Sequence, residues 1–188
     1  MMIIAPATPD DLGLLIAFRD EASRWLASCG IDQWTRPWPT EDLMAAGMLR
    51  NVRARETFIV WDDDTPVATI TIDRWANPDL WTPEEAAEPA LYAHKLTVAR
   101  AYAGRELGAE LLDWAGSRAD ADGARWLRVD VWTTNRKLQR YYLDRGFTHV
   151  RTVALAHNPS GALFQRPARR AATPRLREAP SSAVARLR

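Results

Sequence analysis

The stretch LTVARAYAGRELGAELL (96–112) has residue types and spacing suited to holding a phosphate group. Gly104 and Gly108 lie where a strand-like run gives way to a helical pattern, and a helix start presents unpaired N–H groups and a dipole that favour an anion. Small residues would let a diphosphate approach the amides of residues 103–109. The spacing matches neither GxxxxGK[ST] nor GxGxxG, which disfavours a nucleoside triphosphate or dinucleotide site. The same glycines also fit an ordinary turn with close packing, so both interpretations stay open.

A second motif, NRKLQRYYLDRGF (135–147), places Asn135 seven residues before Tyr142 and eleven before Gly146. A tyrosine phenol, with an ordinary pKa of about 10, can donate a proton to a departing thiolate. The alternative is a core-facing tyrosine whose hydroxyl finds an internal partner. No Ser/His/Asp set accompanies the motif, so the chemistry it indicates is proton transfer without a covalent enzyme intermediate.

These two motifs, in this order and separated by the strand WLRVDVW (126–132), resemble the GNAT superfamily of acyl-CoA N-acyltransferases. The resemblance is close over residues 91–150 and looser over 3–166. It implies an α/β (α+β) fold: a twisted, mixed, mostly antiparallel sheet of six to seven strands flanked by about four helices. The two central strands would splay apart to hold acetyl-CoA. The implied activity is transfer of an acetyl group to a primary amine, with Tyr142 as general acid.

The resemblance also implies a set of cofactor residues. Backbone groups of Leu96, Thr97 and Val98 would pair with the pantetheine arm of coenzyme A, and Asn135 would steady that arm. The diphosphate would be held by the amides of Ala103, Gly104, Arg105, Glu106, Leu107, Gly108 and Ala109.

The chain departs from the family pattern Arg/Gln-x-x-Gly-x-Gly/Ala at two of these positions. Ala103 lacks the first polar side chain, and Glu106 replaces the first glycine. A carboxylate directed inward would repel a diphosphate. We therefore expect Glu106 to face solvent, with Arg105 or Arg100 compensating its charge.

The base that accepts the amine proton is less determined by the sequence. His94 lies on the strand beside the expected acyl site and titrates near neutral pH, which makes it the first candidate, with Tyr92 on the same strand face as a lesser one. A hydrogen-bonded core histidine is the alternative. Other possible acceptors of the proton are water, Asp73, Glu84, Glu85 and Asp130.

Aromatic residues concentrate in two proline-containing segments, 31–40 and 74–90, where connecting segments are usually polar. They could anchor these segments to the core or form walls of an acceptor pocket, where stacking or cation–π contacts would suit an apolar or cationic acceptor. The residues expected to line that pocket are Trp34, Trp38, Trp75, Trp81 and Tyr92.

Hydrophobic periodicity predicts the elements that would position these residues. Helices are expected from Thr8 to Gly30 and from Thr40 to about Arg53, with a threonine as cap of each. Further helices are expected before Gly123 and Gly146. Strands are expected at 3–7, 57–62, 66–73, 91–98, 126–132, 147–155 and 162–165, and 74–90 is expected to be a long loop.

Charge is distributed unevenly along the 188 residues. Residues 166–188 carry seven arginines against Glu178, a net +6, which leaves 18 basic and 23 acidic residues in 1–165. We expect one domain over 1–166 and a basic tail over 167–188, disordered from 168 onward because it can bury little apolar surface. Such a tail could contact nucleic acid, but the net negative charge of the body disfavours nucleic acid as a partner.

Composition excludes several classes. No apolar run approaches the ~18 residues of a membrane span, so we expect a cytoplasmic chain with no membrane partner. Cys29 is the single cysteine and the three histidines are scattered, so we expect no disulfide and no metal site. The chain would act as a monomer or homodimer on a small-molecule or protein amine. The alternative to an enzyme is a non-catalytic domain of the same fold that binds coenzyme A.

Overall fold

The computed structural model describes residues 2–35, 40–172 and 175–180. Its N-terminal part forms β1 (Met2–Pro6), the short 3₁₀ helix η1 (Pro9–Asp11), α1 (Leu12–Ser28) and α2 (Glu41–Arg53). The predicted threonine cap is confirmed for α2, whereas Thr8 caps η1 and the N-cap of α1 itself is Asp11. The backbone N–H of Thr8 donates to Asp11 Oδ2 over 2.7 Å, and Thr40 Oγ1 accepts from the N–H of Leu43 over 3.3 Å.

The remaining chain completes one eight-stranded sheet in the order β6-β7-β5-β4-β3-β2-β1-β8. All neighbouring strands are antiparallel except the pairs β1–β8 and β4–β5. The mixed, mostly antiparallel sheet is therefore as predicted. The elements that follow α2 are β2 (Thr57–Asp62), β3 (Thr65–Asp73), α3 (Pro83–Ala87), β4 (Ala90–Val98), η2 (Arg100–Tyr102), α4 (Leu107–Ala121), β5 (Trp126–Val131), α5 (Arg136–Asp144), β6 (Thr148–Thr152), β7 (Ala162–Pro167) and β8 (Arg177–Glu178).

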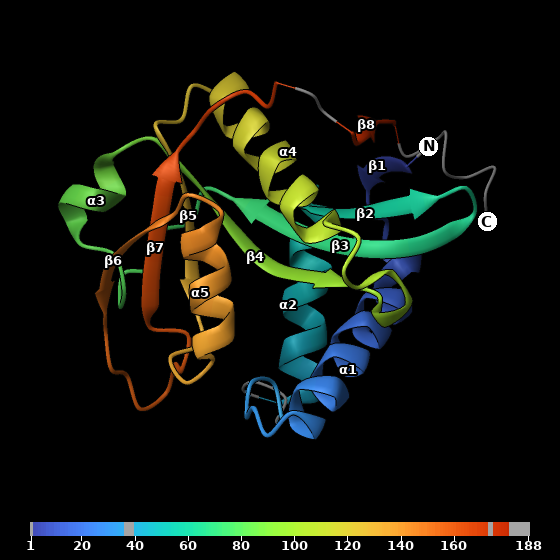
Figure 1. Ribbon diagram of the computed structural model, residues 1–188, viewed down its shortest axis with the longest axis horizontal. Coiled ribbons are helices and arrows are strands. Elements are labelled where there is room, and N and C mark those ends of the chain that lie inside the picture. The colour runs from blue at the N-terminus through green and yellow to red at the C-terminus, as the bar shows by residue number, and fades with distance from the viewer. Residues whose placement is uncertain (1, 36–39, 173–174, 181–188) are drawn as a thin grey trace.

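The sheet opens at its centre. The parallel strands β4 and β5 pair only at Ala90↔Trp126, Leu91↔Leu127 and Tyr92↔Arg128. Beyond Tyr92 the two strands diverge, and in Figure 1 the start of α4 and the whole of α5 lie on either side of this opening. The predicted splay between the central strands is thus present in the fold.

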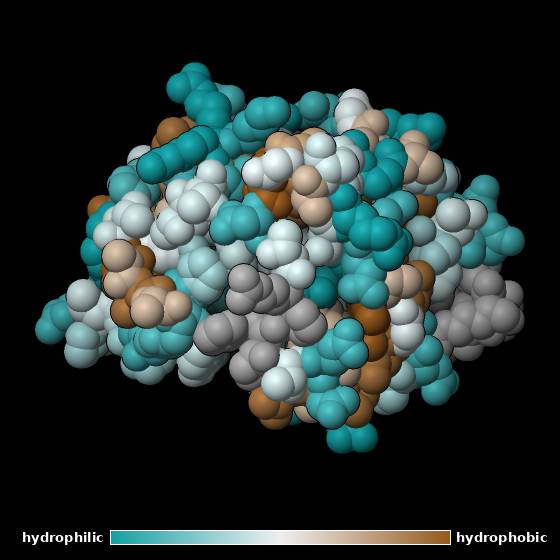
Figure 2. All heavy atoms as spheres, turned by 90° about the horizontal axis from the view of Figure 1, so that it is seen from below, coloured by the Kyte–Doolittle hydropathy of each residue, from teal (hydrophilic) through white to brown (hydrophobic). Residues whose placement is uncertain are grey.

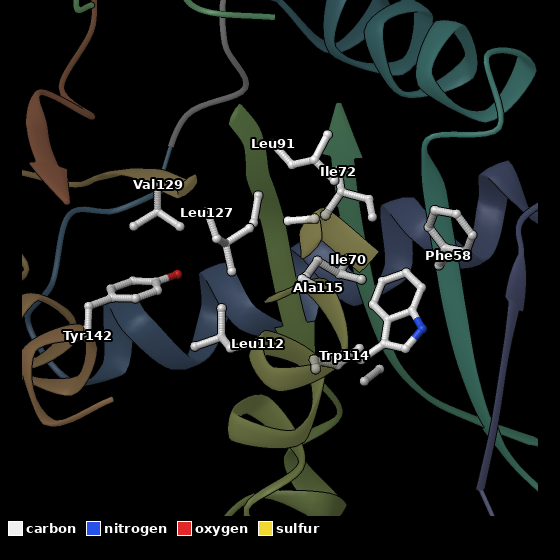
Figure 3. Packing of buried hydrophobic residues seen from close by; sticks show 14 of the residues in the cluster. Phe58, Ile70, Ile72, Leu91, Leu112, Trp114, Ala115, Leu127, Val129 and Tyr142 are labelled. Atoms are coloured by element: carbon white, nitrogen blue, oxygen red, sulfur yellow. The ribbon is translucent and has the colours of Figure 1, made fainter. Parts of the chain in front are cut away.

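Helices cover both faces of the sheet. α4 packs on β3, β4 and β5, whereas α1 and α2 lie on the opposite face, as Figure 1 shows. On the α4 side, Leu112 and Ala115 are fully buried against Ile70 and Leu127, the close packing seen in Figure 3. Burial of this apolar surface on both faces is what fixes the sheet on which the opening is built.

The surface carries little continuous apolar area on the face viewed in Figure 2, where hydrophobic residues form small groups among hydrophilic ones. No helix within the described ranges is long and apolar enough to cross a membrane. Nor do the described residues bring together three histidine, cysteine or acidic side chains that could hold a metal ion.

The C-terminal tail was predicted to be disordered from residue 168 onward, but residues 175–180 include a short strand. Residues of β8 pair in parallel with Ile3 and Ile4 of β1, and Leu176 is only 6% exposed. Trp114 Nε1 of α4 donates to Glu178 Oε1 over 2.7 Å. The expected disorder is therefore wrong for residues 175–180, because one leucine and one carboxylate find partners on the body that the tail's composition does not reveal.

The segment 74–90 also departs from a plain loop, since it contains α3. The helix begins with Thr82, whose Oγ1 accepts from the N–H of Glu85 over 3.3 Å while its own N–H donates to the Glu85 carboxylate over 2.9 Å. This capping box and the first-turn Pro83 allow a helix of one turn in a proline-rich segment.

Candidate active site

A bulge in β4 sets the direction of the side chains at the opening of the sheet. Thr71 lies opposite His94, and Thr69 lies opposite Thr97, so β4 has one more residue than β3 between these pairs. Lys95, within the bulge, has a φ of 51°, a left-handed value that is strained for a lysine. After His94, the side chains of β4 therefore do not alternate regularly between the two faces of the sheet.

His94 lies between two carboxylates. Its Nε2 is 3.4 Å from Asp73 Oδ1 at the end of β3, and its Nδ1 is 3.4 Å from Asp130 Oδ1 on β5. Burial lowers the pKa of His94, but the hydrogen bonds and charges of Asp130 and Asp73 raise it more, to about 9. With this pKa, the imidazole of His94 is in its protonated form at neutral pH.

Tyr142 faces the same opening from α5. Its ring is 5.2 Å from Phe147 and 6.3 Å from Phe164, and Figure 3 shows the hydroxyl directed away from α5 toward Leu127 and Leu112. Tyr142 is 8% exposed, and its hydroxyl has no hydrogen-bond partner among the described residues. Burial raises the pKa of Tyr142 well above its ordinary value, so the phenol keeps its proton.

The turn before α4 has the geometry expected of an anion cradle. Gly104 has a φ of 79° and Glu106 a φ of 61°, and within the described residues the N–H groups of 104–106 donate no hydrogen bond. The N–H of Ala109 is already used, because it donates to the Glu106 carbonyl over 2.9 Å. The N–H groups of Leu107 and Gly108 likewise donate to no carbonyl in the described part of the chain, so the free amides cover residues 104–108 of the predicted range 103–109.

Gly108 has a packing role as well. A Cβ at this position would lie 2.8 Å from the hydroxyl oxygen of Tyr141, and Leu96 Cδ2 is a further neighbour at 3.8 Å. A side chain here would push Tyr141 away from α4. The packing interpretation left open by the sequence thus holds for Gly108.

Glu106 faces solvent as expected, with 59% of its side chain exposed. Its counter-charge is Arg145, which donates from Nη2 to Glu106 Oε2, and not Arg105 or Arg100. The Arg105 guanidinium stacks 4.6 Å above the Tyr102 ring, and that of Arg100 stacks 3.9 Å above Trp25. The expectation for these two arginines is therefore wrong, since each is turned toward an aromatic ring.

Asn135 caps α5. Its Oδ1 accepts from the N–H of Leu138 over 3.0 Å, and its Nδ2 donates to Gln33 Oε1 over 2.7 Å. The side chain is 5% exposed and already holds two partners. Its demonstrated role is to fix the start of α5, and with it the register of Tyr142, against the segment that follows α1.

Three adjoining cavities run through the opening. The outer groove, of about 320 Å³, includes Leu96, Thr97, Val98 and Asn135. The central cavity, of about 250 Å³, includes His94, Lys95, Asp130 and Tyr142. The inner cavity, of about 190 Å³, lies between the sheet and the helices α1 and α2, and shares Trp34, Lys95, Trp132 and Ser160 with the central cavity.

The predicted acceptor aromatics separate into different environments. Trp34, with a φ of 63°, borders all three cavities. Trp75 is 60% exposed and lies outside them. Trp38 lies outside the described residues.

The prediction that Trp81 and Tyr92 line an acceptor pocket is wrong. Both are 2% exposed, and they pack edge to face with ring centroids 5.6 Å apart. The guanidinium of Arg128, fully buried, stacks 4.7 Å above Trp81 and donates to the Tyr92 hydroxyl over 3.1 Å. These aromatics anchor the 74–90 segment, so neither a pocket role nor a base role remains for Tyr92.

Sequence reasoning missed the residues that close the opening from the α1 side. Asp32 Oδ1 accepts from Trp132 Nε1 over 3.0 Å and from the Thr134 hydroxyl over 2.5 Å, and Gln33 holds Asn135. Polar residues in a proline-rich segment carry no signal for such pairing across about 100 residues of chain. Only the fold brings these positions together.

A mixed sheet that opens between two parallel central strands, with a helix start at the opening, is the architecture of an acyl-CoA acyltransferase. Residues 19–147 match the model of the Acetyltransferase (GNAT) family, and the chain belongs to that family. A curated relative from Bacillus subtilis (strain 168), named as the uncharacterized N-acetyltransferase YesJ, is 23% identical over 146 residues, covering 76% of this chain and 79% of the relative.

Solved structures show the same fold. A GNAT-family acetyltransferase from Listeria monocytogenes 4b F2365 superimposes with a TM-score of 0.72 at 20% identity, covering 88% of this chain and 94% of the other. The PaiA N-acetyltransferase from Thermoplasma acidophilum, solved in complex with coenzyme A, gives a TM-score of 0.67 at 17% identity, with 89% and 99% covered.

Proposed function

We propose that the protein transfers an acetyl group from acetyl-CoA to a primary amine by direct attack of the amine on the thioester. The observation that carries this proposal is the hydroxyl of Tyr142, which has no hydrogen-bond partner in the described part of the chain and borders the same cavity as His94 and Asp130. A proton donor and a proton acceptor in one cavity suit an amine acyl transfer. Membership of the GNAT family and the coenzyme A complex of a structural neighbour support it.

The residues present fit coenzyme A. Beyond Tyr92 the edge of β4 that faces β5 has no strand partner among the described residues, so backbone groups of Leu96, Thr97 and Val98 could pair with the amides of pantetheine as if with a further strand. The free amides of 104–108 would take the diphosphate. Arg105 adds a positive charge beside them.

In the proposed reaction the acceptor nitrogen bonds to the acetyl carbon while the bond from that carbon to sulfur breaks. Tyr142 gives its proton to the departing thiolate. In molecules whose His94 has first released its proton to solvent, the neutral imidazole accepts the proton that the amine must lose, and Asp73 and Asp130 stabilise the imidazolium that results. Each proton thus has a donor and an acceptor in the central cavity.

The test is the kinetic effect of Tyr142→Phe. Thiol release from acetyl-CoA is measured with a panel of primary amines, and coenzyme A binding is measured by calorimetry. Loss of the proton donor should lower kcat by about tenfold or more while leaving binding nearly unchanged. Tyr102→Phe is the matched control, because that hydroxyl donates to Asp62 Oδ2 over 3.0 Å away from the cavity, and its kcat should stay within about twofold.

An unchanged kcat in Tyr142→Phe would contradict the role of Tyr142. Binding of coenzyme A without thiol release for any amine would instead favour a non-catalytic domain of the same fold. The two results are distinguishable because binding and turnover are measured separately.

A further inference from the structure

The inner cavity has an uneven charge. Its wall combines apolar side chains such as Leu15 and Met48 with a row of threonine hydroxyls that includes Thr69 and Thr97. Two basic residues, Arg19 and Lys95, also border it, and its described lining contains no carboxylate. A cavity that must admit an amine would be expected to avoid cationic walls, because like charges repel.

Of the two basic residues that border the inner cavity, Lys95 is the one without an ion-pair partner among the described residues. Its Nζ donates to the neutral Asn51 Oδ1 over 3.3 Å, and it forms no ion pair with any residue in the part of the chain that the structure describes. Arg19 differs, because its Nη1 lies 3.6 Å from Asp20 Oδ1 and its Nη2 donates to the carbonyl of Trp34. Desolvation lowers the pKa of Lys95 and the charges of Asp73 and Asp130 oppose this shift, while the residue as a whole remains exposed to solvent.

The position of Lys95 at the cavity wall requires a strained backbone conformation. The bulge and the φ of 51° direct its side chain so that it borders both the inner and the central cavity. Non-glycine residues with such a φ persist where the surrounding structure fixes them, and they cluster at ligand sites.

The central cavity, unlike the inner one, has a carboxylate in its wall. Asp130 lines it beside His94, whose other ring nitrogen faces Asp73, so an acceptor ammonium can enter next to this cluster, and Lys95 lies where the central cavity meets the inner one. The two cavities share four lining residues, so one small molecule can extend from the carboxylate cluster to Lys95. Its two ends would then meet charges of opposite sign.

We infer that the acceptor is a small amine that also carries a carboxylate, with an apolar body between or beside these groups. The amine lies at the Asp73–His94–Asp130 cluster, and the carboxylate pairs with Lys95. A monovalent carboxylate suits one ammonium, whereas a phosphate would call for several donors. The inference rests on the proposed function, since it identifies the acceptor of that same reaction.

The experiment compares acceptors that differ only in the carboxylate. Thiol release from acetyl-CoA is measured with L-leucine against isoamylamine, L-phenylalanine against phenethylamine, and 6-aminohexanoate against hexylamine, which varies the distance between amine and carboxylate. We expect kcat/KM to favour at least one carboxylated member over its plain amine by about tenfold or more. Lys95→Met should lower this ratio by a similar factor, and Lys95→Arg should retain most of it.

Lys137→Met is the matched control. Lys95 and Lys137 are the two lysines of the sequence, and Lys137 borders the outer groove instead of the inner cavity. Its substitution should leave the ratio unchanged. In a second measurement, independent of variants and turnover, L-leucine, L-phenylalanine and 6-aminohexanoate are each titrated against their plain amines into wild-type protein saturated with coenzyme A. The preferred acid should bind more tightly than its amine.

Turnover of the plain amines at rates equal to all three acids, or an unchanged ratio in folded Lys95→Met protein, would overturn the inference and leave the proposed function intact. If Lys95→Met does not fold, equal binding of every acid and its amine to the wild-type protein would also overturn it. The absence of both coenzyme A binding and thiol release with every probe would instead mean that the proposed function itself fails.

Discussion

Arg145, the C-cap of α5, donates from Nη2 to Oε2 of Glu106, the N-cap of α4, over 2.5 Å. The pair ties the expected diphosphate turn to the helix that carries Tyr142. It also neutralises the carboxylate of Glu106, a residue whose own amide is among the free amides of this turn.

Breaking this pair should weaken coenzyme A binding. Arg145→Met leaves the Glu106 carboxylate without its counter-charge beside the diphosphate, and we expect an affinity about fivefold lower by calorimetry. The double variant Arg145→Met/Glu106→Gln should recover most of the loss, and added salt should reduce the effect because Glu106 is exposed. A hundredfold tighter binding in Glu106→Gly would show that the carboxylate faces the ligand and contradict its outward orientation.

The pKa of His94 predicts a pH dependence of turnover. With a pKa raised to about 9, the imidazole is protonated at neutral pH, so kcat/KM should rise with pH until about 9 as His94 becomes able to accept a proton. His94→Gln should be slower and should lose this part of the profile, leaving only the ionisation of the acceptor amine. A profile in His94→Gln that parallels the wild type would remove His94 as the base.

Protonated His94 stabilises the folded protein. Its pKa in the folded state, about 9, lies above the ordinary value of 6.5, so its contribution to the free energy of unfolding is fully present below about pH 6.5 and is lost as the pH rises through about 9. Thermal unfolding of the wild type should therefore move to lower temperature across this range relative to His94→Gln. Parallel curves for the two proteins would mean that Asp73 and Asp130 do not hold the proton on His94.

Arg128 should be required for stability. Its guanidinium, fully buried, donates to Gln165, to the Glu85 carbonyl, to Tyr92 and to Glu88. Arg128→Met would leave these acceptors without a donor, and the free energy of unfolding should fall by about 3 to 5 kcal/mol in urea denaturation. Arg125→Met is the control, since Arg125 also pairs with Glu88 but its side chain is 66% exposed. This variant should lower the free energy of unfolding by less than about 1 kcal/mol. An equal decrease in the free energy of unfolding in the two variants would show that Arg128 does not stabilise the protein through its burial.

Leu176 tests the docking of the tail. Leu176→Ala removes a buried side chain at the junction with α4 and should lower the free energy of unfolding by about 2 kcal/mol. Arg177→Ala, at the exposed next position, should change it by less than about 0.5 kcal/mol. Turnover should be unaffected in both, because neither residue borders the three cavities. A Leu176→Ala protein as stable as the wild type would support the disorder that composition suggests.

The sequence by itself determined the local elements and the order of the motifs. Threonine caps, alternating strands and helical periodicity depend on neighbours within a few residues, so the bounds of α1, α2, β2 and β3 follow closely from them. The positions of the turn proposed to hold the diphosphate and of Tyr142 on α5 were predictable because each motif lies within one strand–helix or helix–strand unit. Resemblance to the GNAT family then supplied the topology, which composition and spacing could not.

Tertiary structure alone decided which side chains share the site. The bulge that directs Lys95 toward the inner cavity depends on the pairing of β4 with β3, and the proton held by His94 depends on carboxylates from two other strands. Tyr92 was a pocket candidate from its type and strand position, yet a buried arginine from the next strand makes it structural. Such contacts join residues tens of positions apart in the sequence. They form, and contribute to stability, only after the sheet has brought these residues together.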